Sequence, residues 1–177
     1  MAFDTEEVDL GALPRTRTAM MVNIASPGAA FQWWRLPADG VGLARMEFII
    51  SNLIRVHPMA LVHPERVTDE QEAAQIRELT SAYADPKEYF VEALALGIAK
   101  IAAPYYPHPV IVRLSDFKTN EYAHLVGGGS FEVPEENPML GFRGASRYYD
   151  DRYREGFALE CAALKRVREP SASPTSL

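Results

Sequence analysis

Three short apolar runs along the chain predict buried β-strands. They lie in residues 19–27, 40–50 and 109–113, and the second strand is expected to end near Arg45. The third begins with consecutive β-branched residues and closes on Arg113, a residue type that is rarely buried without a partner. Apolar runs without polar alternation are typical of strands covered on both faces, as in a parallel sheet.

Helical patterns separate these strands. Residues 29–36 have room for about two helical turns. Residues 68–83 begin with Thr-Asp-Glu-Gln, in which the threonine, Thr68, and the glutamine have the spacing of a capping box. Asp85-Pro86 offers an N-cap and a first-turn proline for a further helix, which is expected to end near residue 104. Its apolar residues recur at steps of three or four: Phe90, Leu94, Ile98 and Ile101.

The last predicted helix has one apolar face and ends at Glu169-Pro170. That face contains Tyr153, Phe157, Cys161, Leu164 and Val167. In this position Cys161 is interpreted as a small buried hydrophobe rather than a nucleophile. The small, polar, proline-rich residues 170–177 are expected to form a disordered tail, and the polar residues 1–18 are interpreted as a linker.

The alternation of strands and helices predicts an α/β fold with a parallel sheet. Three strands are too few to close a barrel, which takes about 250 residues, so residues 19–169 are expected to form part of a larger domain. The glycine-rich stretch 125–138 lacks the Lys-Ser or Lys-Thr pair of a phosphate-binding loop. It is interpreted as a mobile turn.

Composition narrows the classes of function. The 177 residues carry a formal net charge of −6, which argues against a nucleic-acid partner and leaves at most a small anionic ligand. A single cysteine excludes an internal disulfide, and no apolar run approaches the roughly 20 residues that span a bilayer, so no membrane association is expected. With no basic and apolar signal at its N-terminus, the chain is expected to work in the reducing cytoplasm.

Three arginines follow apolar segments in similar contexts: Arg45, Arg113 and Arg143. Ligands of parallel α/β folds bind at the carboxyl ends of strands, so converging guanidinium groups there predict a site for phosphate or carboxylate. A simpler interpretation is also open, in which each arginine forms a salt bridge with a nearby acid. The pairs would be Arg45 with Glu47, Arg113 with Asp116, and Arg143 with Glu135 or Glu136.

Other candidate residues carry weaker signals. The aromatic group of Phe31, Trp33 and Trp34 could stack on bases, but few basic residues accompany it, so packing is the favoured interpretation. The histidines are scattered without the spacing of a zinc site and are interpreted as surface or loop residues. They are His57, His63, His108 and His124.

Four segments together resemble the phosphoenolpyruvate-utilising enzymes. They are GVGLARMEFII at 40–50, VIVRLSDFKTNEY at 110–122, ENPMLGFRGASRYY at 136–149 and FALECAALKRVR at 157–168. The resemblance runs over about residues 13–169. The motif of the third strand is similar to that of the pyruvate, water dikinase branch of the family.

This resemblance implies a partial (β/α)8 TIM barrel, roughly its first three strand–helix units, that binds phosphoenolpyruvate or pyruvate. In that branch, ATP, pyruvate and water give phosphoenolpyruvate, AMP and phosphate through a phosphohistidine, with Mg²⁺. Arg45 and Arg113 match the family's substrate-binding arginines, and Arg143 matches a further active-site arginine. The family's magnesium ligands, catalytic cysteine, ATP-binding domain and phosphohistidine have no counterparts in this chain.

Two interpretations of function follow. In the first, the chain is a fragment of such an enzyme, contacts ATP only through domains that it lacks, and is inactive alone. In the second, it is a stand-alone phosphoenolpyruvate-binding module or an oligomeric assembly module without catalysis, because three unclosed strands leave sheet edges to be covered.

Overall fold

The computed structural model describes residues 9, 12, 14 and 16–169 of the chain. The tail predicted for residues 170–177 and most of the linker predicted for residues 1–18 lie outside the described residues. None of the helices in the described part is long and apolar enough to cross a membrane.

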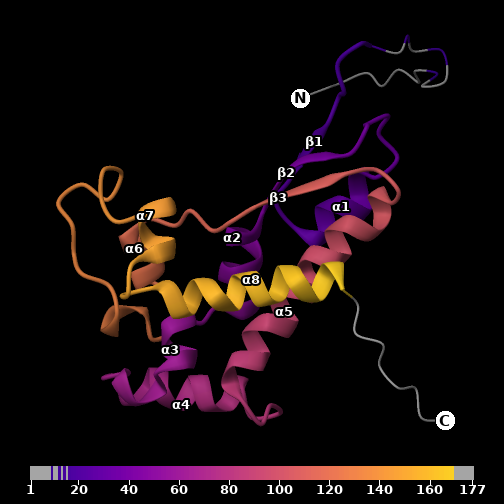
Figure 1. Cartoon of the computed structure of the whole chain (residues 1–177). Coiled ribbons are helices and arrows are strands. Elements are labelled where there is room, and N and C mark those ends of the chain that lie inside the picture. Colours follow the sequence, from indigo (N-terminus) through magenta and orange to yellow (C-terminus); the bar gives the residue numbers. More distant parts are fainter. Residues whose placement is uncertain (1–8, 10–11, 13, 15, 170–177) are drawn as a thin grey trace, which may run out of the picture.

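A small parallel sheet forms the centre of a mixed α/β fold (Figure 1). Its strands are β1 (Val22–Ile24), β2 (Val41–Arg45) and β3 (Val110–Arg113), and they lie side by side in that order. Both neighbouring pairs are parallel. The three predicted strands and their parallel arrangement are therefore confirmed, and the second strand ends at Arg45 as expected.

Helical segments follow each of the first two strands. After β1, Ser26 caps the short helix α1 by accepting a hydrogen bond of 3.3 Å from the Ala29 amide. After β2 the chain passes directly into a helix with no residue between them. The segments in this half of the chain are α1 (Pro27–Trp33), α2 (Met46–Ile49), a π-helical turn (Ile50–Ile54), α3 (Pro58–Val62), a 3₁₀ turn (Pro64–Arg66), α4 (Glu70–Leu79), α5 (Pro86–Ala102) and a second 3₁₀ turn (Ala103–Tyr105).

The predicted starts of the two long helices are right to within one residue. Asp85 caps α5 by accepting a hydrogen bond of 3.0 Å from the Lys87 amide. Helix α4 is capped by Asp69 and not by Thr68, because the Asp69 carboxylate accepts hydrogen bonds from two amides of the first turn. Thr68 is bound instead to the Ser130 hydroxyl, 62 residues away.

The core lies where α5 packs against the other helices. All four apolar residues predicted for its inner face are buried. Helix α5 contacts α1, α2 and α3, and along much of its length it contacts α8 (Arg154–Arg168), which crosses it in yellow in Figure 1. Apolar periodicity alone therefore predicted this helix and its buried face.

Helix α8 confirms the predicted apolar face except at Cys161. Tyr153 is buried, and Phe157, Leu164 and Val167 are partly buried against the core, whereas Cys161 is exposed. The most buried residues of the helix lie slightly to one side of this face: Gly156, Leu159, Glu160 and Ala163. The prediction of a buried Cys161 is wrong, because small residues let α8 approach its neighbours closely and an acid with internal partners is drawn inward. A Cβ on Gly156 would lie only 3.1 Å from the Cβ of Pro58.

Between β3 and α8 the chain makes a long excursion, orange in Figure 1. It contains α6 (Thr119–Ala123), a 3₁₀ turn (Gly128–Ser130) and α7 (Ala145–Tyr149). The first part of the stretch predicted as a mobile turn is packed: Gly128 is buried, and Gly127 is buried with φ of 80°. A Cβ on Gly127 would lie 2.6 Å from that of Ala60, so close packing explains this glycine.

The aromatic residues of α1 are not packed as expected. Phe31, Trp33 and Trp34 are 47% to 56% exposed, because this short helix buries only Ala30 and turns its aromatic side chains outward. The Arg35 guanidinium lies 5.4 Å from the Trp34 ring centroid.

Candidate functional site

A cavity of about 610 Å³ opens at the carboxyl edge of the sheet. Arg45 and Arg113, the last residues of β2 and β3, line it, and so does Arg143 from the excursion. Arg45 and Arg113 are direct partners in the parallel register of the two strands. The structure thus brings the three predicted arginines together at one cavity, at the edge where ligands of parallel α/β folds bind.

Two acids lie between the arginines. Glu47, which is 9% exposed, accepts hydrogen bonds from the Arg113 guanidinium and from the Asp116 amide, the latter at 2.9 Å. Asp116 accepts from Arg143 Nε at 3.1 Å and Nη2 at 2.8 Å, and it lies 3.8 Å from Arg113 Nη1. The hydrogen bonds from Arg143 lower the pKa of Asp116, so this acid is ionised at neutral pH.

These contacts correct two of the three predicted local salt bridges. The pair of Arg113 with Asp116 is confirmed, although Glu47 is the closer partner. Arg143 pairs with Asp116 and not with Glu135 or Glu136, and Arg45 does not pair with Glu47. Asp116 is shared between Arg113 and Arg143, whereas Glu47 pairs with Arg113 alone among the described arginines.

Arg45 is the arginine that remains open to a ligand. Its side chain is exposed at the cavity, and no hydrogen bond or ion pair joins this side chain to another residue within the described part of the chain. Two buried polar atoms of the site also lack protein partners among the described residues, Arg113 Nε and Glu47 Oε2. Because the Arg45 guanidinium has no partner that limits its donors, it can form charge-assisted hydrogen bonds with an anion in the cavity. An unpaired buried donor such as Arg113 Nε is unfavourable.

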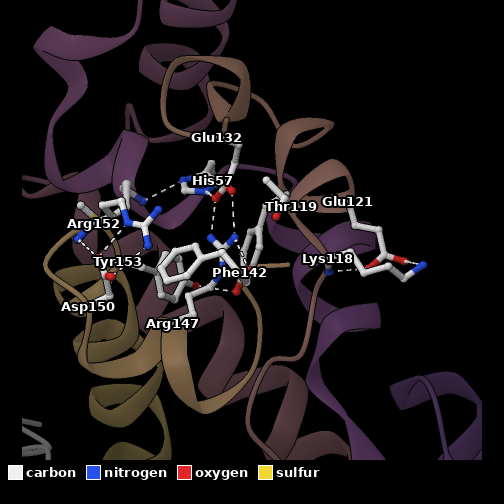
Figure 2. Close-up of polar contacts among 12 residues, drawn as sticks. His57, Lys118, Thr119, Glu121, Glu132, Phe142, Arg147, Asp150, Arg152 and Tyr153 are labelled. Atoms are coloured by element: carbon white, nitrogen blue, oxygen red, sulfur yellow. Dashed lines mark hydrogen bonds and ion pairs between the residues drawn. The ribbon is translucent and has the colours of Figure 1, made fainter. Parts of the chain in front are cut away.

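A second polar cluster lies under the excursion, and sequence reasoning missed it. Figure 2 shows Glu132 between His57 and Arg147. Glu132 accepts hydrogen bonds from His57 Nε2 at 3.0 Å and from both terminal nitrogens of Arg147. All three side chains are almost completely buried. The cluster joins His57, at the start of α3, to two residues of the excursion, Glu132 and Arg147 of α7.

His57 lies in a loop, as one of the two predicted alternatives has it, but it is fully buried and not on the surface. Its Nδ1 accepts a hydrogen bond of 3.1 Å from the Met59 amide and so caps α3, which leaves the proton on Nε2 for Glu132. Burial lowers the pKa of His57, and the ring is therefore neutral at pH 7. The signal that was overlooked is the His57-Pro58 pair, an N-cap followed by a first-turn proline.

Glu160 on α8 is a further buried acid, and its pKa departs from the ordinary value of a glutamate. It accepts hydrogen bonds from the Ser115 amide at 3.1 Å, the Ser115 hydroxyl and the Tyr153 hydroxyl at 2.9 Å. Burial outweighs these hydrogen bonds and raises the pKa of Glu160 to about 6, from an ordinary value of 4.5. The folded protein therefore holds this proton more tightly than the unfolded chain does.

Glu160→Gln is expected to change how stability depends on pH. Ionisation of Glu160 costs the folded wild type about 2 kcal/mol, because the unfolded chain loses the same proton at lower pH. This contribution to stability is present below the unfolded pKa and is lost as the pH rises through the folded one. Urea unfolding gives the free energy of unfolding of both proteins at about pH 4 and about pH 7.5. The difference between variant and wild type should shift in favour of the variant by about 2 kcal/mol from the lower to the higher pH. An equal difference at the two pH values would contradict the raised pKa.

Comparison with known proteins identifies the family of the chain. The model of the family described as "PEP-utilising enzyme, PEP-binding domain", where PEP is phosphoenolpyruvate, matches residues 4–175. Proteins named phosphoenolpyruvate synthase are similar to the chain: 56% identical in Synechocystis sp., over 94% of this chain and 20% of the relative. The protein from Deinococcus radiodurans is 55% identical, over 94% of this chain and 21% of its own length.

The corresponding protein of Escherichia coli is 49% identical, over 95% of this chain and 21% of the relative. The chain thus spans about a fifth of the length of the curated relatives that it matches. Because the family model covers nearly all of its residues, the chain belongs to the phosphoenolpyruvate-utilising enzyme family and corresponds to the domain that the family description calls PEP-binding.

Proposed function

We propose that the chain binds phosphoenolpyruvate and pyruvate in the cavity at the carboxyl edge of the sheet, through Arg45, Arg113 and Arg143. The observation that carries the proposal is the pairing of Arg45 with Arg113 in the strand register, at the edge of one cavity that Arg143 also lines. Phosphoenolpyruvate bears a phosphate and a carboxylate on the same carbon atom. Neighbouring guanidinium groups match two adjacent anions, and each can form paired hydrogen bonds.

The acids of the site support this proposal because they orient the arginines without using all their donors. A guanidinium has five N–H donors, and a carboxylate engages at most two of them in a paired contact. Arg113 keeps its Nε free, and Arg143 Nη1 contacts only the Met139 sulfur, at 3.5 Å. Glu47 and Asp116 would therefore hold the guanidinium groups of Arg113 and Arg143 in place, while the remaining N–H donors of these arginines are available to the ligand.

For the enzymes of this family, we propose that bound pyruvate gives a methyl proton to a base supplied elsewhere in such an enzyme and becomes an enolate. The enolate oxygen then attacks the phosphorus of the phosphohistidine, the P–N bond breaks, and the histidine leaves. The arginines would then stabilise negative charge on the enolate and on the transferred phosphoryl group. They would not act as acid or base, since guanidinium keeps its proton. Mg²⁺, which the family resemblance implies for the full enzymes, would add to this stabilisation of negative charge. In the described residues no group of three or more His, Cys, Asp or Glu side chains could hold a metal ion, so its ligands would come from other parts of such an enzyme.

Two finer points belong to the same proposal. The order of the three parallel strands supports an assignment to the first units of a (β/α)8 barrel. A cytoplasmic location of the enzyme is a separate part of the proposal. The ATP-dependent steps would require other parts of such an enzyme. With ATP and pyruvate, the isolated chain is therefore expected to form no AMP.

A second candidate function, an assembly module without catalysis, is favoured by one observation. A groove of about 620 Å³ runs between β3 and the C-terminal half of α8, lined by the exposed Ile111 and Cys161. Size-exclusion chromatography with light scattering discriminates the two functions: a defined oligomer favours assembly, and a compact monomer that binds phosphoenolpyruvate favours the substrate site.

Calorimetric titration with phosphoenolpyruvate tests the leading proposal. We expect one saturable site whose affinity falls as salt is added, because the attraction is between charges. Inorganic phosphate and pyruvate each offer a single anionic group, so each should bind at least about tenfold more weakly than phosphoenolpyruvate. Binding of all three with equal affinity, or no binding at all, would reject a site for two anionic groups.

A further inference from the structure

The segment that carries Arg143 is held from two sides at the preceding residue. The Phe142 amide donates a hydrogen bond of 2.8 Å to Glu135. The Phe142 carbonyl accepts two hydrogen bonds from Arg147, from Nε at 3.2 Å and from Nη2 at 2.9 Å. Both backbone groups of this residue are thus bound by charged side chains, which form stronger hydrogen bonds than neutral ones.

Arg147 has little freedom of its own. It is 2% exposed, and its terminal nitrogens are paired with the Glu132 carboxylate. Its guanidinium carbon lies 4.4 Å from the ring centroid of Phe142 and 4.5 Å from that of Tyr122. Figure 2 shows this guanidinium enclosed between Glu132 and the Phe142 segment. The carbonyl before Arg143 is therefore tied to a rigid, buried group.

Glu135 ties the same segment to the start of α6, where Lys118 and Glu121 line the cavity. Its carboxylate also accepts a hydrogen bond from the Thr119 hydroxyl, at the start of α6. Residue 141 must be glycine for this arrangement, because a Cβ there would lie 2.0 Å from Glu135 Oε2. Glu135 is one of the acids considered for a salt bridge with Arg143, and the structure assigns it to the neighbouring backbone.

Apolar burial does little to hold the rest of this segment. Val133, Met139 and Leu140 are all exposed, Leu140 by 86%. A segment with few buried apolar contacts opens readily unless polar contacts hold it. Asp116 holds the Arg143 guanidinium itself, and the contacts at Phe142 hold the backbone that carries it.

We propose that Arg147 and Glu135 are positioning residues, which hold the Phe142 peptide so that the Arg143 guanidinium is preorganised for an anionic ligand. This inference rests on the proposed function, since it takes Arg143 to be a ligand-binding residue. Preorganisation matters because displacements of about 1 Å in a binding group are costly.

Hydrogen exchange followed by mass spectrometry tests the positioning directly and needs no ligand. Arg147→Lys keeps a positive charge beside Glu132 but lacks the fork that reaches both Glu132 and Phe142. Glu135→Ala removes the other contact and leaves the buried pair intact, so it decides the question if Arg147→Lys fails to fold. Arg154→Lys, at an exposed position of α8, is the matched control.

In both test variants, exchange over residues 132–149 is expected to accelerate at least about tenfold, while α5 exchanges as in the wild type. The control should match the wild type throughout. The proposal is overturned if residues 132–149 of Glu135→Ala exchange at the wild-type rate. It is also overturned if exchange in Glu135→Ala is faster to the same extent over the whole chain.

A double-mutant cycle with phosphoenolpyruvate links the positioning to binding. Arg147→Lys should weaken binding about tenfold, and it should add nothing in the background of Arg143→Met, because its effect passes through Arg143. Additive losses would overturn the proposed role. If the wild type does not bind phosphoenolpyruvate, the proposed function fails, whereas the exchange result still decides whether these residues hold the segment.

Discussion

Arg113→Ala is expected to weaken binding of phosphoenolpyruvate at least about 100-fold, to below detection in a calorimetric titration. The change removes a cation that lines the cavity. It also leaves Glu47, which is nine-tenths buried, without the guanidinium that neutralises it. A stranded buried carboxylate repels an incoming anion, so the loss exceeds that of a single hydrogen bond.

Two further variants separate these causes. Arg113→Ala combined with Glu47→Gln removes the stranded charge and should recover part of the lost affinity. Arg77→Ala removes one positive charge from the exposed face of α4, away from the cavity, and should bind as the wild type does. Unchanged affinity in Arg113→Ala itself would exclude Arg113 from the site.

Leu94→Ala is expected to lower the free energy of unfolding by about 3 kcal/mol. Leu94 lies in the middle of α5 with no exposed surface, and the space it leaves cannot close because α5 is packed on several sides. Urea unfolding monitored by circular dichroism measures the loss. Leu96→Ala is the matched control, since Leu96 on the same helix is 52% exposed and its loss should be well under 1 kcal/mol. Equal losses for the two variants would contradict the assigned buried face.

The main features of the sheet were predictable from the chain. Consecutive apolar residues located the three strands, and parallel strands place their carboxyl ends at one edge, which brings Arg45 beside Arg113. The apolar stripe of α5 was predictable for a similar reason, because large aliphatic residues at helical spacing have no stable alternative to burial. Both signals lie within short stretches of the sequence, and they were sufficient to locate the strands and the buried face of α5.

Contacts between distant segments were not predictable from spacing. Arg113 pairs with Glu47, 66 residues earlier, and Arg143 with Asp116, 27 residues earlier. The rule that an arginine pairs with the nearest acid failed at Arg143, because Glu135 binds a backbone amide. Which acid an arginine meets depends on how the elements pack, and sequence distance carries little information on that.

Buried polar groups were the other source of error. His57, Glu132 and Arg147 are polar or charged and yet are buried, since each satisfies the others. On α8, Glu160 faces inward and Cys161 outward, the reverse of a ranking by hydrophobicity. A pattern of apolar positions cannot show such networks because their stability comes from partners in other segments.

The most direct test of the account is NMR of the arginine Nε–Hε groups during a titration with phosphoenolpyruvate. The central claim is that Arg45, Arg113 and Arg143 bind one ligand at the carboxyl edge of the sheet. All three resonances should shift and should saturate together with one dissociation constant, while the Arg77 resonance stays in place. A ligand that shifts none of the three, or that leaves Arg45 and Arg113 unperturbed, would contradict the account.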